Sequence, residues 1–96
     1  MSLHGIKISE QQLCLISKAL ADPKRFEMLQ QIGASENAPT CSCLRESTGL
    51  AAATVSHHLK ELESAGLIQI ERIGKFAHIS FRRDVWNAYL KQLSTL

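Results

Sequence analysis

The sequence predicts a mainly α-helical domain with one small β-hairpin, in the order α-α-α-α-β-β-α. Apolar residues recur at helical spacing along most of the chain, and two stretches of alternating apolar residues flank the pair Gly74-Lys75. The chain has 96 residues, of which 45% are hydrophobic, and a chain of this size buries a single core. We therefore expect residues 1–96 to form one domain.

The first two helices are predicted by their capping residues. Ser9 can cap a helix that extends to about Ala21. Asp22 can cap the next helix, which begins at Pro23, because proline tolerates the first helical position, and ends at Gly33. The residues expected on the buried sides of these helices are Leu13, Ile16 and Leu20 in the first and Phe26, Leu29 and Ile32 in the second.

A helix-turn-helix pattern follows. Thr40 or Ser42 can cap a short helix that ends at Gly49, and a longer helix extends from about Ala52 to Ala65. The apolar side of the longer helix consists of Val55, Leu59 and Leu62. A short helix, a turn containing glycine and a longer helix are typical of the helix-turn-helix unit, although a helical hairpin in a bundle has the same pattern.

The next segment distinguishes these two folds. Residues 67–73 and 76–81 carry alternating apolar side chains, and Gly74-Lys75 suits a tight hairpin turn whose first residue has a positive φ. Asp84 can then cap a terminal helix, whose apolar residues are Val85, Trp86, Tyr89, Leu90 and Leu93. A hairpin directly after the unit predicts a winged helix-turn-helix fold. The first and last helices form its expected dimer surface.

The longer helix of the unit has an outward side suited to double-stranded DNA. With the apolar side turned inward, helical geometry exposes small and polar residues, which suit phosphates and base edges in the major groove. The cations at the hairpin tip suit the minor groove, although a solvated turn would carry them too. The residues predicted to contact DNA are Ala53, Thr54, Ser56, His57, Lys60, Arg72 and Lys75.

Other positions in this helix are predicted to have structural roles. His58 lies close to the apolar side, so we expect it to be packed and hydrogen-bonded rather than to read bases. Ala51 and Ala52 stand where a capping hydroxyl would help, and alanine cannot cap. The start of the helix therefore lacks a side-chain cap.

Three stretches of the chain carry a family resemblance, and a hairpin segment, residues 72–75, follows them. They are Ala19-Leu20-Ala21-Asp22-Pro23-Lys24-Arg25-Phe26, Thr54-Val55-Ser56-His57-His58-Leu59-Lys60-Glu61-Leu62 and Ala65-Gly66-Leu67-Ile68. In this order and spacing the chain resembles the ArsR/SmtB family of bacterial winged-helix repressors over nearly its whole length. The resemblance implies a homodimer that binds operator DNA and releases it when a metal, a metalloid or another signal arrives.

The cysteines suggest a site for such a signal. Cys41 and Cys43 resemble the Cys-x-Cys pair with which some members of the family bind soft metals or arsenite. The pair is displaced by one residue, because Ser42 falls at the second ligand position. The family's other metal site, on the terminal helix, lacks its histidines here, since Asp84 is followed by Val85 and Trp86.

Thiol chemistry leaves three interpretations of this pair open. The thiols bind a thiophilic ion as an effector, sense oxidation, or are inert, and no cofactor is required. Co-ligation by residues two apart needs an extended segment at Pro39-Thr40 rather than a regular helix. A metal site also needs further ligands, from Cys14, His4 or the other subunit, although we expect Cys14 to lie in the core.

Composition excludes several other classes of protein. A net charge of +2 is compatible with nucleic acid, and the lack of a long apolar run or signal pattern predicts a soluble, cytoplasmic protein without a membrane partner. An enzyme would need Cys41 or Cys43 paired with His57 or His78, but no phosphate-binding loop or complete metal motif is present, so we expect no enzyme. A winged-helix module that binds protein instead of DNA is a further alternative.

Overall fold

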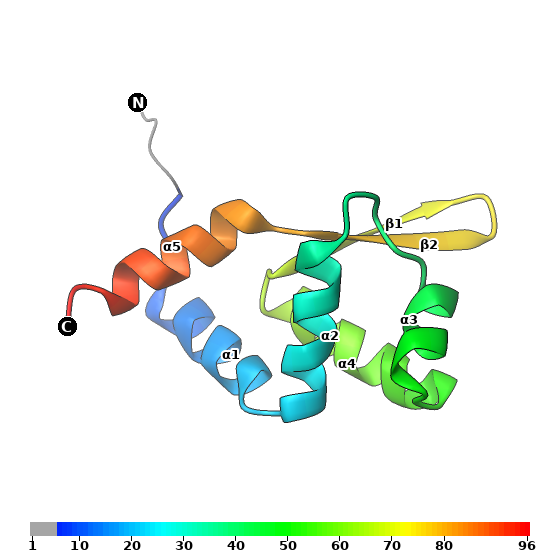
Figure 1. Ribbon diagram of the computed structural model, residues 1–96. Coiled ribbons are helices and arrows are strands. Elements are labelled where there is room, and N and C mark those ends of the chain that lie inside the picture. Colours follow the sequence, from blue (N-terminus) through cyan, green and yellow to red (C-terminus); the bar gives the residue numbers. More distant parts are fainter. Residues whose placement is uncertain (1–5) are drawn as a thin grey trace.

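The computed structural model describes residues 6–96, and within them it contains five helices and one antiparallel hairpin. The elements are α1 (Glu10–Leu20), α2 (Pro23–Ala34), α3 (Cys41–Thr48), α4 (Ala52–Ser64), β1 (Ile68–Ile73), β2 (Phe76–Phe81) and α5 (Arg83–Leu93). This order confirms the predicted fold class, and Figure 1 shows the arrangement of the elements. His4, a candidate ligand in the sequence, lies outside the described residues.

The predicted caps begin the first three helices. Ser9 and Asp22 accept hydrogen bonds from backbone N–H groups in the first turns of α1 and α2, as the sequence predicts. The cap of α3 is Thr40 and not Ser42. The Thr40 hydroxyl accepts a hydrogen bond of 3.2 Å from the N–H of Cys43. These local signals set where the helices begin because each one satisfies donors that a helix leaves free.

Two predicted helix boundaries are wrong. Gly33 does not end α2, because it keeps a helical conformation and the helix continues to Ala34. Asp84 does not cap α5 either, since the helix already begins at Arg83. Only Arg82 separates it from β2, and the Asp84 carboxylate pairs with the Arg82 guanidinium at 2.9 Å.

The core lies between the helices and the inner side of the hairpin. Fully buried side chains from several elements meet there, and the largest are Ile16, Met28, Leu44, Leu62, Leu67, Ile79 and Val55. The buried side of α2 consists of Met28, Leu29 and Ile32, so the inclusion of Phe26 was wrong. Phe26 is 38% exposed because it lies more than a quarter turn from the centre of that side.

The hairpin has two different sides. In the register, Ile73 pairs with Phe76 across the turn and Ile68 pairs with Phe81 at the base. Gly74 has a φ of 63°, which confirms the expected tight turn. The inner side carries Ile68, Ile70, Arg72, Ala77, Ile79 and Phe81, and the outer side carries Gln69, Glu71, Ile73, Phe76, His78 and Ser80.

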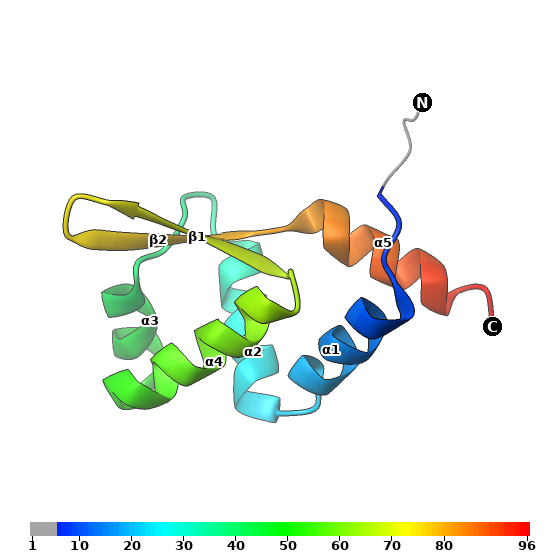
Figure 2. The same cartoon turned by 180° about the vertical axis from the view of Figure 1, so that it is seen from behind.

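A short backbone link places α3 beside the hairpin. The N–H of Ile79 donates to the carbonyl of Pro39 at 2.9 Å, and Thr40 forms an isolated bridge with His78. The helix-turn-helix unit therefore lies against one side of the hairpin, with α4 below β1 in the view from behind (Figure 2).

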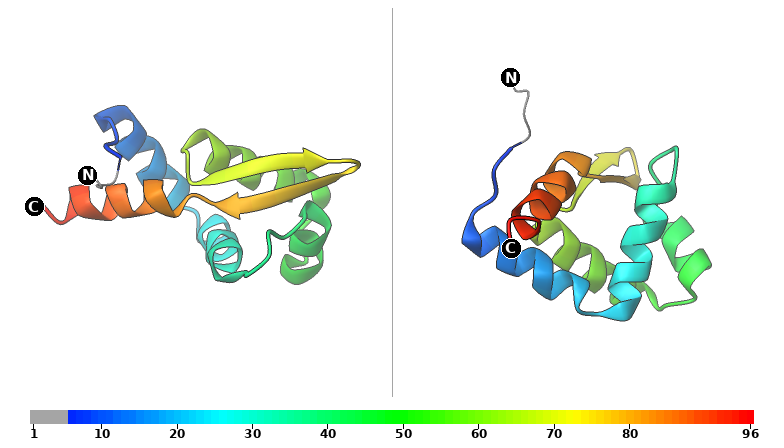
Figure 3. Two further views of the ribbon diagram at one scale, coloured as in Figure 1. Left: turned by 90° about the horizontal axis from the view of Figure 1, so that it is seen from above. Right: turned by 60° about the vertical axis from the view of Figure 1, so that its left-hand side comes forward.

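The molecule is elongated, with principal extents of 38 × 27 × 20 Å. The hairpin projects at one end, whereas α5 extends to the opposite end, near α1 and the C-terminus (Figure 3). The hydroxyls of Ser17 in α1 and Tyr89 in α5 share a hydrogen bond of 3.0 Å, which links the two helices. In the described part of the chain, no helix has both the length and the apolar character needed to cross a membrane.

Candidate nucleic-acid interface

The turn between α3 and α4 leaves the start of α4 open to solvent. Gly49 ends α3 in the left-handed region, with a φ of 71°. Ala51 occupies the N-cap position of α4 and makes no side-chain capping bond, as its sequence predicts. The first N–H groups of α4 thus lack a side-chain acceptor, and the positive end of the helix dipole faces outward. Such an end favours a phosphate group.

The predicted orientation of α4 is confirmed. Val55, Leu59 and Leu62 are at most 2% exposed and pack into the core. Exposed positions on the other sides of the helix are Ala53, Thr54, Ser56, His57 and Lys60. These side chains are available to a partner, and their contact with DNA stays a prediction.

A groove of about 390 Å³ lies between α4 and the hairpin. Its lining consists of Cys41, Ala53, Ser56, His57, Leu59, Lys60, Glu63, Ile70, Arg72 and Ala77. Most of the predicted contact residues therefore meet around one groove. Thr54, in the first turn of α4, and Lys75, in the hairpin turn, are exposed but lie outside the lining.

The charges of this surface are mainly positive. Lys60 and Arg72 line the groove and Lys75 extends the positive charge to the hairpin tip. Among the described residues, the ion pairs involve other side chains, so these three cations have no carboxylate within ion-pair distance. Glu63 is the acidic residue in the lining, and it would repel phosphates at the C-terminal end of α4.

His58 is packed and hydrogen-bonded on the buried side of α4, as predicted. The ring is 6% exposed, and its Nδ1 accepts a hydrogen bond of 3.3 Å from Nε of Arg25 in α2. Burial lowers the pKa of His58 below its ordinary value of 6.5, and this effect outweighs the opposing attraction of Asp22. His58 therefore helps to fix α4 against α2 and does not face the groove.

The cysteines occupy three different environments. Cys41 is half-buried in the groove lining, whereas Cys43 is exposed in the first turn of α3. The Thr40 hydroxyl donates to the Cys43 sulfur at 3.2 Å, and this hydrogen bond lowers the pKa of the thiol. Cys14 is exposed, so its expected place in the core is wrong, because the buried side of α1 is defined by Ile16 and Ala19.

The geometry of α3 bears on ion binding. Because the helix begins at Cys41, the pair lies in regular helix and not in the extended segment that co-ligation needs. Within residues 6–96, no group of three or more His, Cys, Asp or Glu side chains is placed to hold a metal ion. An ion at this pair would therefore need either a change at the start of α3 or ligands from elsewhere.

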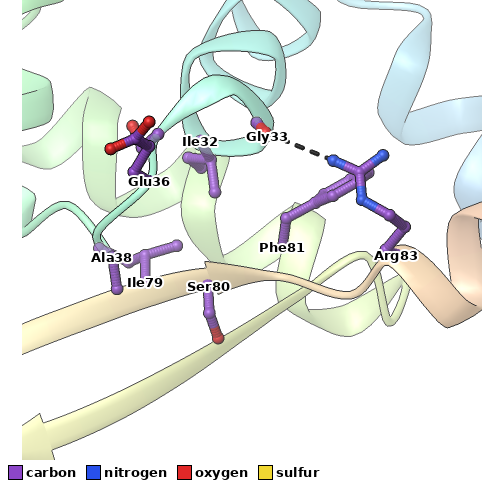
Figure 4. Close-up of a pocket in the computed structure, with 9 residues that line it drawn as sticks. Ile32, Gly33, Glu36, Ala38, Ile79, Ser80, Phe81 and Arg83 are labelled. Atoms are coloured by element: carbon purple, nitrogen blue, oxygen red, sulfur yellow. Dashed lines mark hydrogen bonds between the residues drawn. The ribbon is translucent and has the colours of Figure 1, made fainter.

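A second cavity, of about 230 Å³, lies between the end of α2 and β2 (Figure 4). Arg83 donates to the carbonyl of Gly33 at 3.4 Å, and its guanidinium lies 4.9 Å from the centre of the Phe81 ring. Arg83 therefore links the junction between β2 and α5 to the C-terminal end of α2. None of the predicted contact residues lines the cavity, so it is separate from the groove.

Sequence patterns missed part of the groove. Cys41, Glu63 and Ile70 belong to different elements, and no local pattern indicates that they share a lining. The bridge between Thr40 and His78, which are distant in the sequence, brings the start of α3 with Cys41 beside the hairpin. Helical periodicity identifies the exposed side of α4 but not what stands opposite it.

Comparison with known proteins defines the class. A family model described as a helix-turn-helix domain matches residues 20–71, which include α2, α3, α4 and most of the first strand. Together with the hairpin and the helix that follows it, this match identifies the class as winged helix-turn-helix proteins.

Relatives narrow the class to a family. The HTH-type transcriptional regulator YgaV of Escherichia coli (strain K12) is 28% identical over 98% of this chain and 94% of its own length. The crystal structure of an ArsR family transcriptional regulator is 26% identical, with a TM-score of 0.79 over 94% of this chain and 91% of that one. The chain belongs to the ArsR/SmtB family of winged helix-turn-helix regulators.

A third comparison concerns the fold. The homodimeric winged helix-turn-helix DNA-binding domain Mb0332 from Mycobacterium bovis has a TM-score of 0.73 with this structure. It is 23% identical, and the match covers 94% of this chain and 89% of that one. The shared architecture therefore extends over both terminal helices as well as the helix-turn-helix unit and the hairpin.

Proposed function

We propose that this protein is a homodimeric repressor that binds a specific operator in double-stranded DNA. The groove between α4 and the hairpin carries the proposal, because it gathers exposed hydroxyl, imidazole and cationic groups on one surface. With α4 in the major groove, Ser56 and His57 lie near base edges while Lys60 meets phosphate. The hairpin then follows the adjacent minor groove, and the open N-terminus of α4 faces a phosphate.

Exposed leucines on the terminal helices support dimerisation. Leu90 is 45% exposed and Leu93 is 37% exposed on α5, and Leu15 is 40% exposed on α1. A second copy that covers these leucines would remove apolar surface from water and present two α4 helices to two half-sites. The homodimeric state of the Mycobacterium bovis domain supports this arrangement.

Repression is the simplest outcome of such binding. A protein that occupies a promoter excludes RNA polymerase without any catalytic step, and the groove offers a docking surface rather than an enzyme's active site. The test is transcription in vitro from the promoter of the protein's own gene, with increasing amounts of the purified protein. We expect transcripts to fall as the duplex is occupied, and an unchanged or increased transcript level at full occupancy would contradict repression.

The thiols of α3 are the proposed site of an inducing signal. Cys41 lines the groove and the lowered pKa of Cys43 favours the thiolate, which is the form that binds soft ions and reacts with oxidants. A thiophilic metal or metalloid bound there would disturb the surface that meets DNA. Oxidation of the same thiols is the alternative signal.

These two signals give different results in one experiment. The complex with the upstream duplex is treated with arsenite, cadmium, zinc or a thiol oxidant. Release by one of the ions that Cys41→Ser and Cys43→Ser both abolish would support an ion sensor, and Cys14→Ser tests whether Cys14 supplies a further ligand. Release by oxidant alone would support a redox switch, and a complex indifferent to all four reagents would contradict both.

A further inference from the structure

The tip of the hairpin exposes two large apolar side chains. Ile73 is 56% exposed and Phe76 is 52% exposed, and they are directly paired across the turn formed by Gly74 and Lys75. Directly opposed residues place their side chains on the same side of a hairpin, so these two form one apolar surface.

Folding does not explain this pair. Ile68 and Ile79 of the hairpin belong to the hydrophobic core and Ile70 and Phe81 pack against it, but neither tip residue does. The tip residues lie on the outer side, where their neighbours along the strands are Glu71 and His78. An isoleucine and a phenylalanine on an otherwise polar side suggest a contact made outside the folded chain.

The cations at the turn and just before it favour duplex DNA as that contact. Lys75 lies in the turn between the two apolar residues, and Arg72 precedes them on the inner side. Arg72, the residue before Ile73, lines the groove, so the tip begins next to the groove in the chain. An apolar pair with a lysine in the turn between its members matches the minor groove, where phosphates border the sugars and where proteins insert Phe or Ile between base steps.

We propose that Ile73 and Phe76 form an apolar wedge that the hairpin inserts into the minor groove of the bound duplex. There Phe76 partly unstacks a base step and bends the DNA, while Lys75 pairs with a phosphate. This inference rests on the proposed function, because it takes the docking of α4 as given. It assigns a bend to the operator and a preference for flexible pyrimidine–purine steps at the position of the hairpin.

The test measures bending and affinity on one duplex. A duplex selected by the protein from a random-sequence pool is labelled at both ends, and energy transfer between the labels reports the bend. We expect the wild type to bring the ends closer together. Phe76→Ser should abolish this change and weaken binding by roughly tenfold, the scale expected when one large apolar side chain loses its burial.

Three further variants separate the wedge from other effects. Phe76→Leu keeps an apolar wedge and should retain most of the bend, and Ile73→Ser should reduce it. Phe76→Ser should keep the wild-type dependence of affinity on salt, whereas Lys75→Ala should make that dependence shallower, because only the lysine neutralises a phosphate. Leu96→Ser, at the fully exposed C-terminal residue, is the control and should change nothing.

The outcomes distinguish the wedge from the proposed function. If the pool yields no duplex that the wild type binds, the proposed function fails and the wedge fails with it. If the wild type binds a duplex and Phe76→Ser binds and bends it equally well, the wedge alone is wrong. Loss of self-association in Phe76→Ser, with unchanged DNA binding and bending, would assign the tip to a second copy and also overturn the wedge.

Discussion

At the scale of single residues, the hydrogen bond between Arg25 and His58 connects the fold to pH. The buried ring accepts from Arg25 and is therefore neutral at Nδ1, and burial lowers its pKa in the folded state. In the unfolded chain the ring regains its ordinary pKa of 6.5. Because the unfolded state then takes up a proton first, the free energy of unfolding falls as pH drops below that value.

This linkage gives a prediction for His58→Gln. The amide oxygen of glutamine can still accept from Arg25 but does not titrate, so the variant should lose much less stability than the wild type as the pH falls below about 6.5. Urea unfolding at several pH values measures the difference. Equal slopes for the wild type and His58→Gln would contradict this account.

At the scale of elements, the uncapped start of α4 separates stability from binding. Ala51→Ser should raise the free energy of unfolding by about 1 kcal/mol, because its hydroxyl would accept a free N–H group. Ala51→Asp should also stabilise the fold but weaken duplex binding, by roughly tenfold at low salt, since a carboxylate would compete with phosphate there. Thermal unfolding and duplex titration of both variants test this. Undiminished binding by Ala51→Asp would show that no DNA phosphate binds at the start of α4.

Predictions at this scale succeed where the cause is local. Ser9, Asp22 and Thr40 act on donors within their own first turns, and a glycine with positive φ is needed in the turn at Gly74, so sequence reveals these features. The start of α5 could not be predicted from Asp84, because the distance between β2 and the helix is set by the packing of both.

At the scale of the whole molecule, α5 and the hairpin extend to opposite ends (Figure 3). The expected dimer surface should therefore be removable without touching the DNA-binding surface. Leu90→Glu combined with Leu93→Glu should convert the dimer into a monomer in sedimentation and weaken duplex binding by at least tenfold, because one α4 helix would lose its partner. Leu96→Glu is the control, and a double variant that remains dimeric would place the interface elsewhere.

At the scale of the whole molecule, sequence patterns predict the elements but not the contacts between distant segments. The order of elements and the exposed side of α4 follow from periodicity, because each is a property of one segment. The groove lining depends on how Cys41, Glu63 and Ile70 meet, and the exposure of Cys14 and Phe26 depends on which sides of α1 and α2 face the core. Such contacts between distant segments have no local signal.

The most direct test of the central claim is the affinity of the protein for its own upstream duplex, measured by fluorescence anisotropy over a range of salt concentrations. We expect affinity to fall steeply with salt, and Lys60→Ala and Arg72→Ala each to weaken binding and lower the slope by roughly one per phosphate contact removed. Lys18→Ala, on α1, should match the wild type. Variants at Lys60 and Arg72 that bind like the wild type would show that the groove between α4 and the hairpin is not the DNA-binding surface.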